Sequence, residues 1–140
     1  MKTDKLPFKI RDKIKRSKQS VFVPGDFTDL SGYVQILRVL KNMVDNNELI
    51  KLGQGIYVKV RKSADGKIRP IGYVGDMVKV ALRKYGIKTL PSTAVIEYNS
   101  GISTQVPTGR VIGVDKRVRR QIGYNGVMFQ FETMGKNKVL

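Results

Sequence analysis

The chain has 140 residues and a strongly basic composition, with 27 Lys and Arg against 11 Asp and Glu and a formal net charge of +16 at pH 7. It contains no cysteine, histidine or tryptophan, which excludes a disulfide framework, a thiolate nucleophile and zinc sites built on cysteine or histidine. The length allows one or two small domains, and the excess of cations favours an anionic partner, with nucleic acid ahead of a membrane surface or an acidic protein.

The N-terminal segment is basic and has a helical pattern. Residues 1–20 hold eight Lys or Arg and two Asp. Pro7 is tolerated in a first helical turn, and Ile10 and Ile14 repeat at i and i+4, so we expect a helix over residues 5–18. The segment lacks the long apolar run of a secretory signal, and no window of the chain reaches the roughly 18 consecutive apolar residues of a membrane span. We therefore expect a cytoplasmic protein that does not enter a membrane.

A short strand and a short helix are expected next. Residues 21–23 form an apolar run that suits a small strand, and the Pro-Gly-Asp sequence of residues 24–26 ends it. Asp26 is placed to cap a brief helix that carries Phe27 and Leu30.

The following helix has the clearest amphipathic pattern in the chain. Ser31 is expected to cap it, and it is expected to run from Gly32 to about Asn46. Its apolar face consists of Ile36, Val39, Leu40, Met43 and Val44. Its opposite side carries Gln35, Arg38, Lys41 and Asn42. A helix of this kind buries one face and presents the other to solvent or to a partner.

A hairpin follows this helix. Residues 49–52 and 56–60 suit two strands, and the glycines of residues 53–55 suit a tight turn between them. The order of helix, short strand, short helix, longer helix and hairpin predicts a winged helix-turn-helix in residues 1–62. An alternative is the same fold used for protein contacts only.

A winged helix-turn-helix places its third helix in the major groove of duplex DNA and its hairpin beside it. The side chains expected to reach base edges are Tyr33, Gln35, Arg38 and Asn42. The side chains expected to contact the DNA backbone are Lys9, Lys13, Arg16, Ser31, Lys41, Lys51, Gln54, Lys59 and Arg61. For Tyr33, packing at the start of the helix is an equal alternative to stacking on a sugar or base.

Residues 63–75 are expected to be a linker. Asp65-Gly66 is a turn signal, and Pro70 discourages regular structure. A second, small α+β domain is therefore expected at residues 76–140, and the chain as a whole is expected to be α+β.

The second domain is expected to begin with helices. Asp76 is placed to cap a helix that ends at Tyr85, with Gly86 in the position of a C-terminal glycine cap. Residues 87–90 suit a strand, and Ser92 is expected to cap another short helix.

The second domain is expected to end in a β-hairpin. Residues 110–114 suit one strand, and residues 118–124 and 127–133 flank Asn125-Gly126, the strongest short hairpin signal. A two-residue turn places four pairs opposite each other, namely Tyr124 with Val127, Ile122 with Phe129, Arg120 with Phe131, and Arg119 with Glu132. A candidate second basic patch consists of Arg117, Arg119 and Arg120. It suits phosphate contact or protection of a strand edge equally well.

Several stretches of the sequence are similar to bacterial antitoxin families. In the first half they are residues 21–27, 40–44 and 49–57. In the second half they are residues 78–86, 90–92 and 101–107, and the last of these, Gly-Ile-Ser-Thr-Gln-Val-Pro, is the most specific. The stretches of the first half resemble the winged-helix region of AbiEi-like antitoxins of type IV toxin–antitoxin systems. Those of the second half are similar to a bacterial family related to these antitoxins, and the resemblance covers roughly residues 8–133.

The resemblance implies a bacterial or mobile-element protein that binds inverted repeats in its own promoter through a winged helix, as a monomer or a dimer on the DNA. It also implies a C-terminal part with antitoxin activity, a cognate toxin that looks like a nucleotidyltransferase, and a place in the cytoplasm at the nucleoid. Gln54 stands where the resemblance leads us to expect a basic residue at the wing tip.

No arrangement of residues points to catalysis. Residues 72–75 are rich in glycine but lack the Lys-Ser/Thr pair and the strand–helix context of a phosphate-binding loop. Four acidic residues of the first half are spaced like caps and surface charges rather than like a metal site, namely Asp26, Asp29, Asp45 and Glu48. We therefore expect a protein that is not an enzyme and that uses no cofactor and no metal.

The sequence thus favours a repressor that binds double-stranded DNA sequence-specifically and that, by resemblance, is an antitoxin autoregulating its own operon. One alternative is a protein-interaction module that neutralises a toxin or an acidic partner directly, through the apolar hairpin face and Tyr85, Tyr98 and Tyr124. Another is a structural RNA-binding protein, which the helix-turn-helix order disfavours because its helix suits the major groove of B-form DNA rather than that of A-form RNA.

Overall fold

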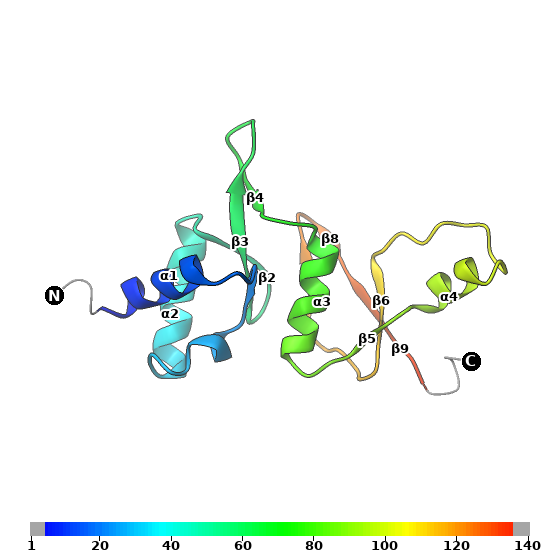
Figure 1. Cartoon of the computed structure of the whole chain (residues 1–140), viewed down its shortest axis with the longest axis horizontal. Coiled ribbons are helices and arrows are strands. Elements are labelled where there is room, and N and C mark those ends of the chain that lie inside the picture. The colour runs from blue at the N-terminus through cyan, green and yellow to red at the C-terminus, as the bar shows by residue number, and fades with distance from the viewer. Residues whose placement is uncertain (1–4, 136–140) are drawn as a thin grey trace. The chain divides into compact units, whose positions relative to one another are not determined.

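The computed structural model describes residues 5–135 (Figure 1). Its helices and strands make up an α+β protein, as the sequence predicts. The chain divides into two compact units, Met1–Met77 and Val78–Leu140, which we call the first and the second unit. No helix among the described residues has the length and apolar character that a membrane span requires.

The first unit begins with α1 (Leu6–Arg16), close to the helix expected over residues 5–18. Pro7 lies in its first turn, where a backbone N–H has no helical partner to lose. Ile10 and Ile14 are buried on one side of the helix because they are four residues apart. This apolar side anchors a helix whose other positions are mostly cationic.

A strand and a 3-10 helix connect α1 to the next α-helix. They are β1 (Val21–Phe22) and η2 (Pro24–Phe27). The prediction that Asp26 caps the short helix is wrong, because Asp26 lies inside it. Its Oδ2 atom accepts a hydrogen bond from the backbone N–H of Val23 at 2.9 Å and so closes the turn from within. Phe27 is fully buried and holds the turn against the core.

The helix α2 (Tyr33–Asp45) agrees with the predicted helix to within one residue at each end. The predicted cap at Ser31 is wrong. The residue before the helix is Gly32, which has an extended backbone and no side chain that could accept a hydrogen bond. Asn46 ends the helix, as expected. The buried face is the predicted one, made of Ile36, Val39, Leu40 and Met43, and it shares one core with the buried residues of α1.

The predicted hairpin is formed by β2 (Leu49–Gly53) and β3 (Ile56–Lys62), with Gln54 and Gly55 at its turn. Gly55 has a φ of 74°, a left-handed value that glycine adopts without a steric penalty. β1 pairs with β3 on the side away from β2, so the strand order is β1-β3-β2. The sheet therefore ties the hairpin to the strand that precedes α2.

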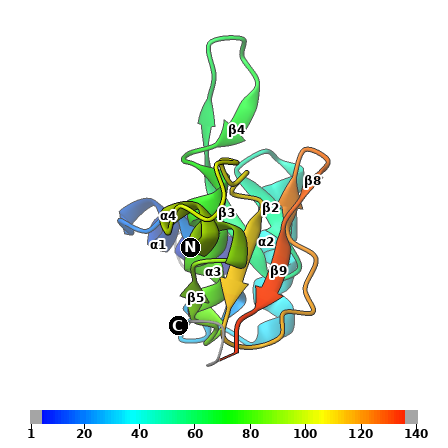
Figure 2. The same cartoon turned by 90° about the vertical axis from the view of Figure 1, so that its right-hand side faces the viewer.

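The expectation that residues 63–75 lack regular structure is wrong. β4 (Ile68–Pro70) pairs antiparallel with the end of β3 and brings Arg69 opposite Arg61. Pro70 is tolerated because β4 is an edge strand, which needs no donor on its outer side. The β3–β4 hairpin runs past β2 and stands clear of the other elements of the first unit in both views (Figures 1 and 2).

The division between the units falls within α3 (Val74–Lys84). The helix begins before Asp76, so this residue lies in the first turn and not at the predicted cap. The glycine cap is confirmed: Gly86 has a φ of 78°, and the N–H of Ile87 donates to the carbonyl oxygen of Leu82 at 2.9 Å. In the second unit, α3 buries Val78, Ala81 and Leu82.

The strand β5 (Thr89–Leu90) and the helix α4 (Thr93–Asn99) follow where the sequence predicts them. The Oγ atom of Ser92 accepts a hydrogen bond from the N–H of Val95 at 3.3 Å. Ser92 is also buried, so this hydrogen bond satisfies a hydroxyl that water does not reach. The predicted cap of α4 is therefore confirmed.

The second unit has its own small sheet. β6 (Val111–Val114) lies between β5 and β9 (Gln130–Thr133), antiparallel to β5 and parallel to β9 (Figure 2). Ile112 and Val114 of the central strand are buried, together with Ile122 from the segment that follows. β6 is thus the centre of the core of this unit.

The Asn125-Gly126 turn joins the short strands β7 (Gly123–Tyr124) and β8 (Val127–Met128). The two turn residues have φ values of 54° and 81°, the left-handed values that a two-residue hairpin turn requires. The last residue of β7 lies opposite the first residue of β8, as the sequence predicts.

The predicted pairing reaches Ile122 and Phe129, where the N–H of Phe129 donates to the carbonyl oxygen of Ile122 at 2.9 Å. Beyond this pair the predicted hairpin is wrong, and the second unit does not end in it. β9 pairs with β6 instead of continuing along β7, which places Phe131 opposite Ile112. A long two-stranded ribbon is only marginally stable, whereas a strand added to a sheet gains support from it. The carboxylate oxygens of Glu132 accept from the N–H and the hydroxyl of Thr93, both at 2.7 Å. Two of the predicted cross-strand pairs do not form, namely Arg120 with Phe131 and Arg119 with Glu132.

Candidate nucleic-acid interface

The solvent side of α2 carries three of the four side chains predicted to read bases. Gln35, Arg38 and Asn42 are all exposed. At about 100° per residue they fall within an arc of about 60° around the helix axis, outside the buried stripe. They share the solvent side of α2 because the apolar residues of the same helix pack in the core. We call this arc, with its one guanidinium and two amides, the α2 strip.

Tyr33 is not part of the α2 strip. It is 59% exposed and lies on the flank of α2 that faces the β2–β3 hairpin, where it lines a groove of about 350 Å³. Lys41 of α2 and Lys51 and Gln54 of the hairpin line the same groove. Asp45 and Tyr57 line it as well, so the structure brings two ammonium groups, one carboxylate and two phenols together around one concave surface. The two cations suit a phosphate group, which would compete with Asp45 for Lys41.

Two of the lysines predicted to contact DNA are used inside the fold. The Nζ atom of Lys13 donates to the carbonyl oxygen of Asp26 at 2.6 Å and to Oδ1 of Asp29 at 2.9 Å. The hydrogen bond from Lys13 is the main reason why the pKa of Asp29 lies below its usual value. The Nζ atom of Lys59 donates to the carbonyl oxygen of Ser17 at 2.6 Å. Both lysines therefore fix the connections between α1 and the elements after it.

Other cations of the predicted interface lie in exposed positions. Lys9 and Arg16 are exposed on α1. Arg16 pairs with Asp12 at 3.2 Å, and Lys41 pairs with Asp45 at 3.3 Å, each across one helical turn. Exposed pairs of this kind contribute roughly 0–1 kcal/mol. Arg16 and Lys41 can therefore exchange these carboxylates for phosphate at little cost.

Arg61 lies apart from the groove residues. β3 runs from the turn that holds Gln54 to the turn of the β3–β4 hairpin, and Arg61 is near the second of these turns. It faces Arg69, whose Nη2 atom pairs with Asp65 at 3.1 Å. Ser31 is half-buried two residues before α2. The predicted backbone contacts are therefore spread over several faces of the first unit.

No local pattern in the sequence indicates the ion pair between Arg11 and Glu48. The Nε and Nη2 atoms of Arg11 donate to Oε1 and Oε2 of Glu48 at 2.7 and 2.8 Å. This bidentate pair joins α1 to the start of β2 and raises the pKa of Arg11, chiefly through the hydrogen bond to Glu48. The partners are 37 residues apart, so only the tertiary fold brings them together.

The candidate second basic patch lies beside the C-terminal end of α3. The guanidinium of Arg120 lies over the ring of Tyr85, 3.7 Å from its centroid. The Nζ atom of Lys116 donates to the carbonyl oxygen of Gly86 at 3.2 Å. Cations are favoured at a helix C-terminus, so these contacts have a structural role of their own. The exposed members of the patch are Arg117 and Arg119.

The sequence of the chain matches a known protein family. Residues 9–140 match the sequence model described as "Family of unknown function (DUF6088)". The chain belongs to this family. No curated protein and no solved structure matches it. The DUF6088 match includes both units, so the α2 strip, the groove and the second basic patch all lie within the family region.

Proposed function

We propose that the protein is a transcriptional regulator that binds double-stranded DNA sequence-specifically through a winged helix-turn-helix in its first unit. The observation that carries the proposal is the connectivity of this unit. β1, between the first two helical elements, pairs with β3, and the β2–β3 hairpin follows α2 directly. A winged helix-turn-helix has this order of helices, small strand and terminal hairpin, with the last helix free on one side.

In this function α2 is the recognition helix. The guanidinium of Arg38 can donate two hydrogen bonds to O6 and N7 of guanine. The amides of Gln35 and Asn42 can each pair with N6 and N7 of adenine. These two amides are about 10 Å apart along the helix, at 1.5 Å per residue, so they are suited to different base pairs.

The groove between α2 and the hairpin supports contact with the DNA backbone. Lys41 and Lys51 line it, and Tyr33 adds a hydroxyl that can donate to a phosphate oxygen. Phosphate contacts fix the position of a protein on the duplex, while base contacts select the sequence. The net charge of +16 adds a sequence-independent attraction that weakens with salt.

Within this function we further propose an antitoxin that represses its own operon by binding inverted repeats in its promoter, in the cytoplasm of a bacterium. This part rests on the resemblance of residues 21–57 and 78–107 to AbiEi-like antitoxins. The partner implied by the resemblance is a cognate nucleotidyltransferase-like toxin.

A gel-shift titration tests the proposed function. The full chain is titrated against duplex DNA from upstream of its own gene, a scrambled duplex of the same composition, and RNA of matched length, each at two salt concentrations. We expect a preference of about a thousandfold or more for the upstream duplex, and we expect it to survive the higher salt. Equal binding of all three, lost at higher salt, would leave only non-specific attraction by charge.

A further inference from the structure

The part of the second unit around α4 is almost uncharged. Asp, Glu, Lys and Arg make up 27% of the chain, yet residues 89–109 contain a single charged residue, Glu97. This segment comprises β5, α4 and most of the loop that leads to β6, and it includes the Gly-Ile-Ser-Thr-Gln-Val-Pro run of residues 101–107. The proposed DNA contacts involve none of these residues.

Apolar side chains project from this segment. Ile102 is 77% exposed, Val106 is 67% exposed, and Tyr98 is also exposed. The N–H groups of Ile102 and Ser103 donate to the carbonyl oxygen of Glu97 at 2.9 and 3.2 Å. The start of the loop is therefore fixed to the C-terminal end of α4, and the exposed apolar groups belong to an ordered surface.

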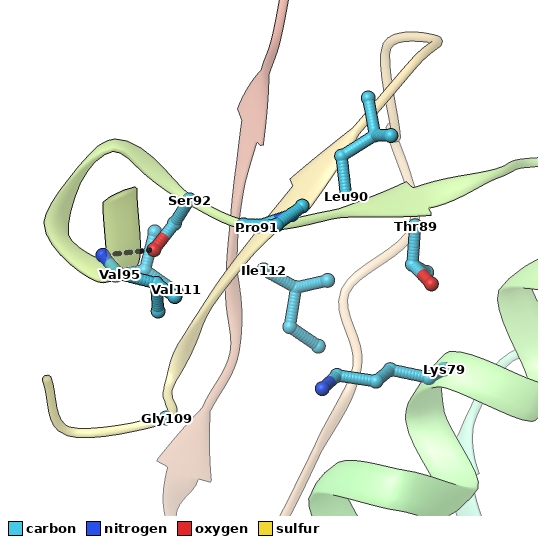
Figure 3. A pocket seen from close by; sticks show the side chains of 9 residues that line it. All are labelled: Lys79, Thr89, Leu90, Pro91, Ser92, Val95, Gly109, Val111 and Ile112. Atoms are coloured by element: carbon cyan, nitrogen blue, oxygen red, sulfur yellow. Dashed lines mark hydrogen bonds between the residues drawn. The ribbon is translucent and has the colours of Figure 1, made fainter. Parts of the chain in front are cut away.

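Two hollows lie on the same part of the second unit. The first has a volume of about 340 Å³ and mostly apolar walls, with Val95, Val111 and Ile112 around it and Lys79 reaching toward it from α3 (Figure 3). The second, of about 240 Å³, is lined by α4 and the loop. Projecting side chains and hollows thus belong to the same part of the second unit, which we call the 89–112 surface.

We propose that the 89–112 surface binds the same surface of a second copy of this chain and forms a two-fold symmetric dimer. The first reason is electrostatic. Each copy carries +16, so most faces of two copies repel each other, and burying unpaired cations between them is unfavourable. Residues 89–112 hold one carboxylate, Glu97, and one guanidinium, Arg110, and Lys79 is a further cation at the first hollow, so two copies can meet here while bringing few cations together. Depletion of charge is also typical of the core of a protein interface.

The second reason is geometric. A two-fold interface uses the same patch on both copies, so the patch must complement itself. The 89–112 surface offers apolar groups that protrude and one mostly apolar hollow that can receive them, beside a second hollow with mixed polar and apolar walls. The dimer does not depend on the proposed DNA-binding function, although two copies would suit an inverted-repeat operator.

Sedimentation equilibrium of the full chain without DNA tests the dimer. We expect a monomer–dimer equilibrium that high salt leaves unchanged or strengthens, because salt screens the remaining repulsion and does not weaken apolar contacts. A chain that stays monomeric at all concentrations, or a dimer that dissociates as salt rises, overturns the proposal. Because DNA is absent, this result is separate from the outcome of the gel-shift titration.

Matched substitutions locate the interface. Val106→Asp is expected to weaken dimerisation about tenfold or more, although the added carboxylate lowers the repulsion between copies. Ile102→Asp is expected to act in the same direction. The control is Val34→Asp in α2, where the valine is 64% exposed and lies outside the surface. Equal effects of Val106→Asp and Val34→Asp, or no effect of Val106→Asp and Ile102→Asp, would overturn the assignment. A cooperative thermal transition shows that each variant is folded, whereas the midpoint itself also depends on dimerisation.

Discussion

Two lysines on α1 that share a similar sequence context have different surroundings. Lys9 and Lys13 are four residues apart and so lie on the same side of the helix. Lys9 is exposed, whereas the ammonium of Lys13 donates to the carbonyl oxygen of Asp26 and lies 5.7 Å from the centroid of the Phe27 ring. Lys13 therefore contributes to the fold, and Lys9 is the better candidate for a DNA phosphate.

We predict that Lys13→Ala lowers the free energy of unfolding by about 1 kcal/mol, because a part-buried hydrogen bond to a backbone carbonyl is lost. Lys9→Ala, the control, is expected to stay within about 0.5 kcal/mol. Urea denaturation measures both. Equal effects of the two substitutions would contradict the structural role of Lys13.

The Lys13→Ala variant is also expected to change the pKa of Asp29. Its carboxylate has a lowered pKa, so its contribution to stability is present above the usual value of 3.8 and is lost as the pH falls through the lowered pKa. Lys13→Ala is expected to raise the pKa of Asp29 toward 3.8, because the largest cause of the shift is removed. An NMR titration of the carboxylate detects this change.

At the scale of elements, the end of α3 depends on one glycine. Gly86 has a φ of 78°, and a Cβ atom there would meet no other atom within 4 Å, so the cost of a side chain is purely conformational. We predict that Gly86→Ala destabilises the second unit by about 1–2 kcal/mol. Gly25→Ala is the control, because Gly25 has no positive φ and its Cβ would make only an ordinary contact at 4.0 Å. Thermal unfolding of both variants measures the difference, and equal midpoints would contradict it.

Local patterns predict a large part of the elements. The bounds of α2, the glycine cap at Gly86 and the turn at Asn125-Gly126 depend only on residues close together in the chain. The pairing of β9 with β6 and of β4 with β3 joins segments by contacts that no periodicity encodes. This is why the long C-terminal hairpin and the linker were wrongly predicted.

The residues of the candidate site also divide into those that local patterns predict and those that only tertiary contacts place. Gln35, Arg38 and Asn42 share one side of α2, which helical periodicity is able to predict. The placement of Tyr33 beside Lys51 depends on how the hairpin packs on α2, and the internal role of Lys59 depends on the position of Ser17. Tertiary contacts therefore decide which of the predicted cations remain available to DNA.

At the scale of the whole molecule, different surfaces carry different chemistry. The first unit has the α2 strip and the groove, which are the parts of the proposed DNA interface. The second unit has the 89–112 surface, which carries few charges, and a basic patch around Arg117 and Arg119. A regulator that binds DNA with one unit and a second copy with the other would explain why the DUF6088 match extends over both.

The central claim is that α2 reads bases while the groove cations hold the DNA backbone. The most direct test compares Arg38→Ala with Lys51→Ala in full-chain titrations of the upstream and the scrambled duplex over a series of salt concentrations. Arg38→Ala is expected to weaken binding to the upstream duplex by about 1–3 kcal/mol and to change binding to the scrambled duplex little. Lys51→Ala is expected to weaken both complexes alike and to reduce the salt slope by about one. If the two substitutions have the same effect on both duplexes, or if neither has an effect, α2 does not read the DNA as proposed.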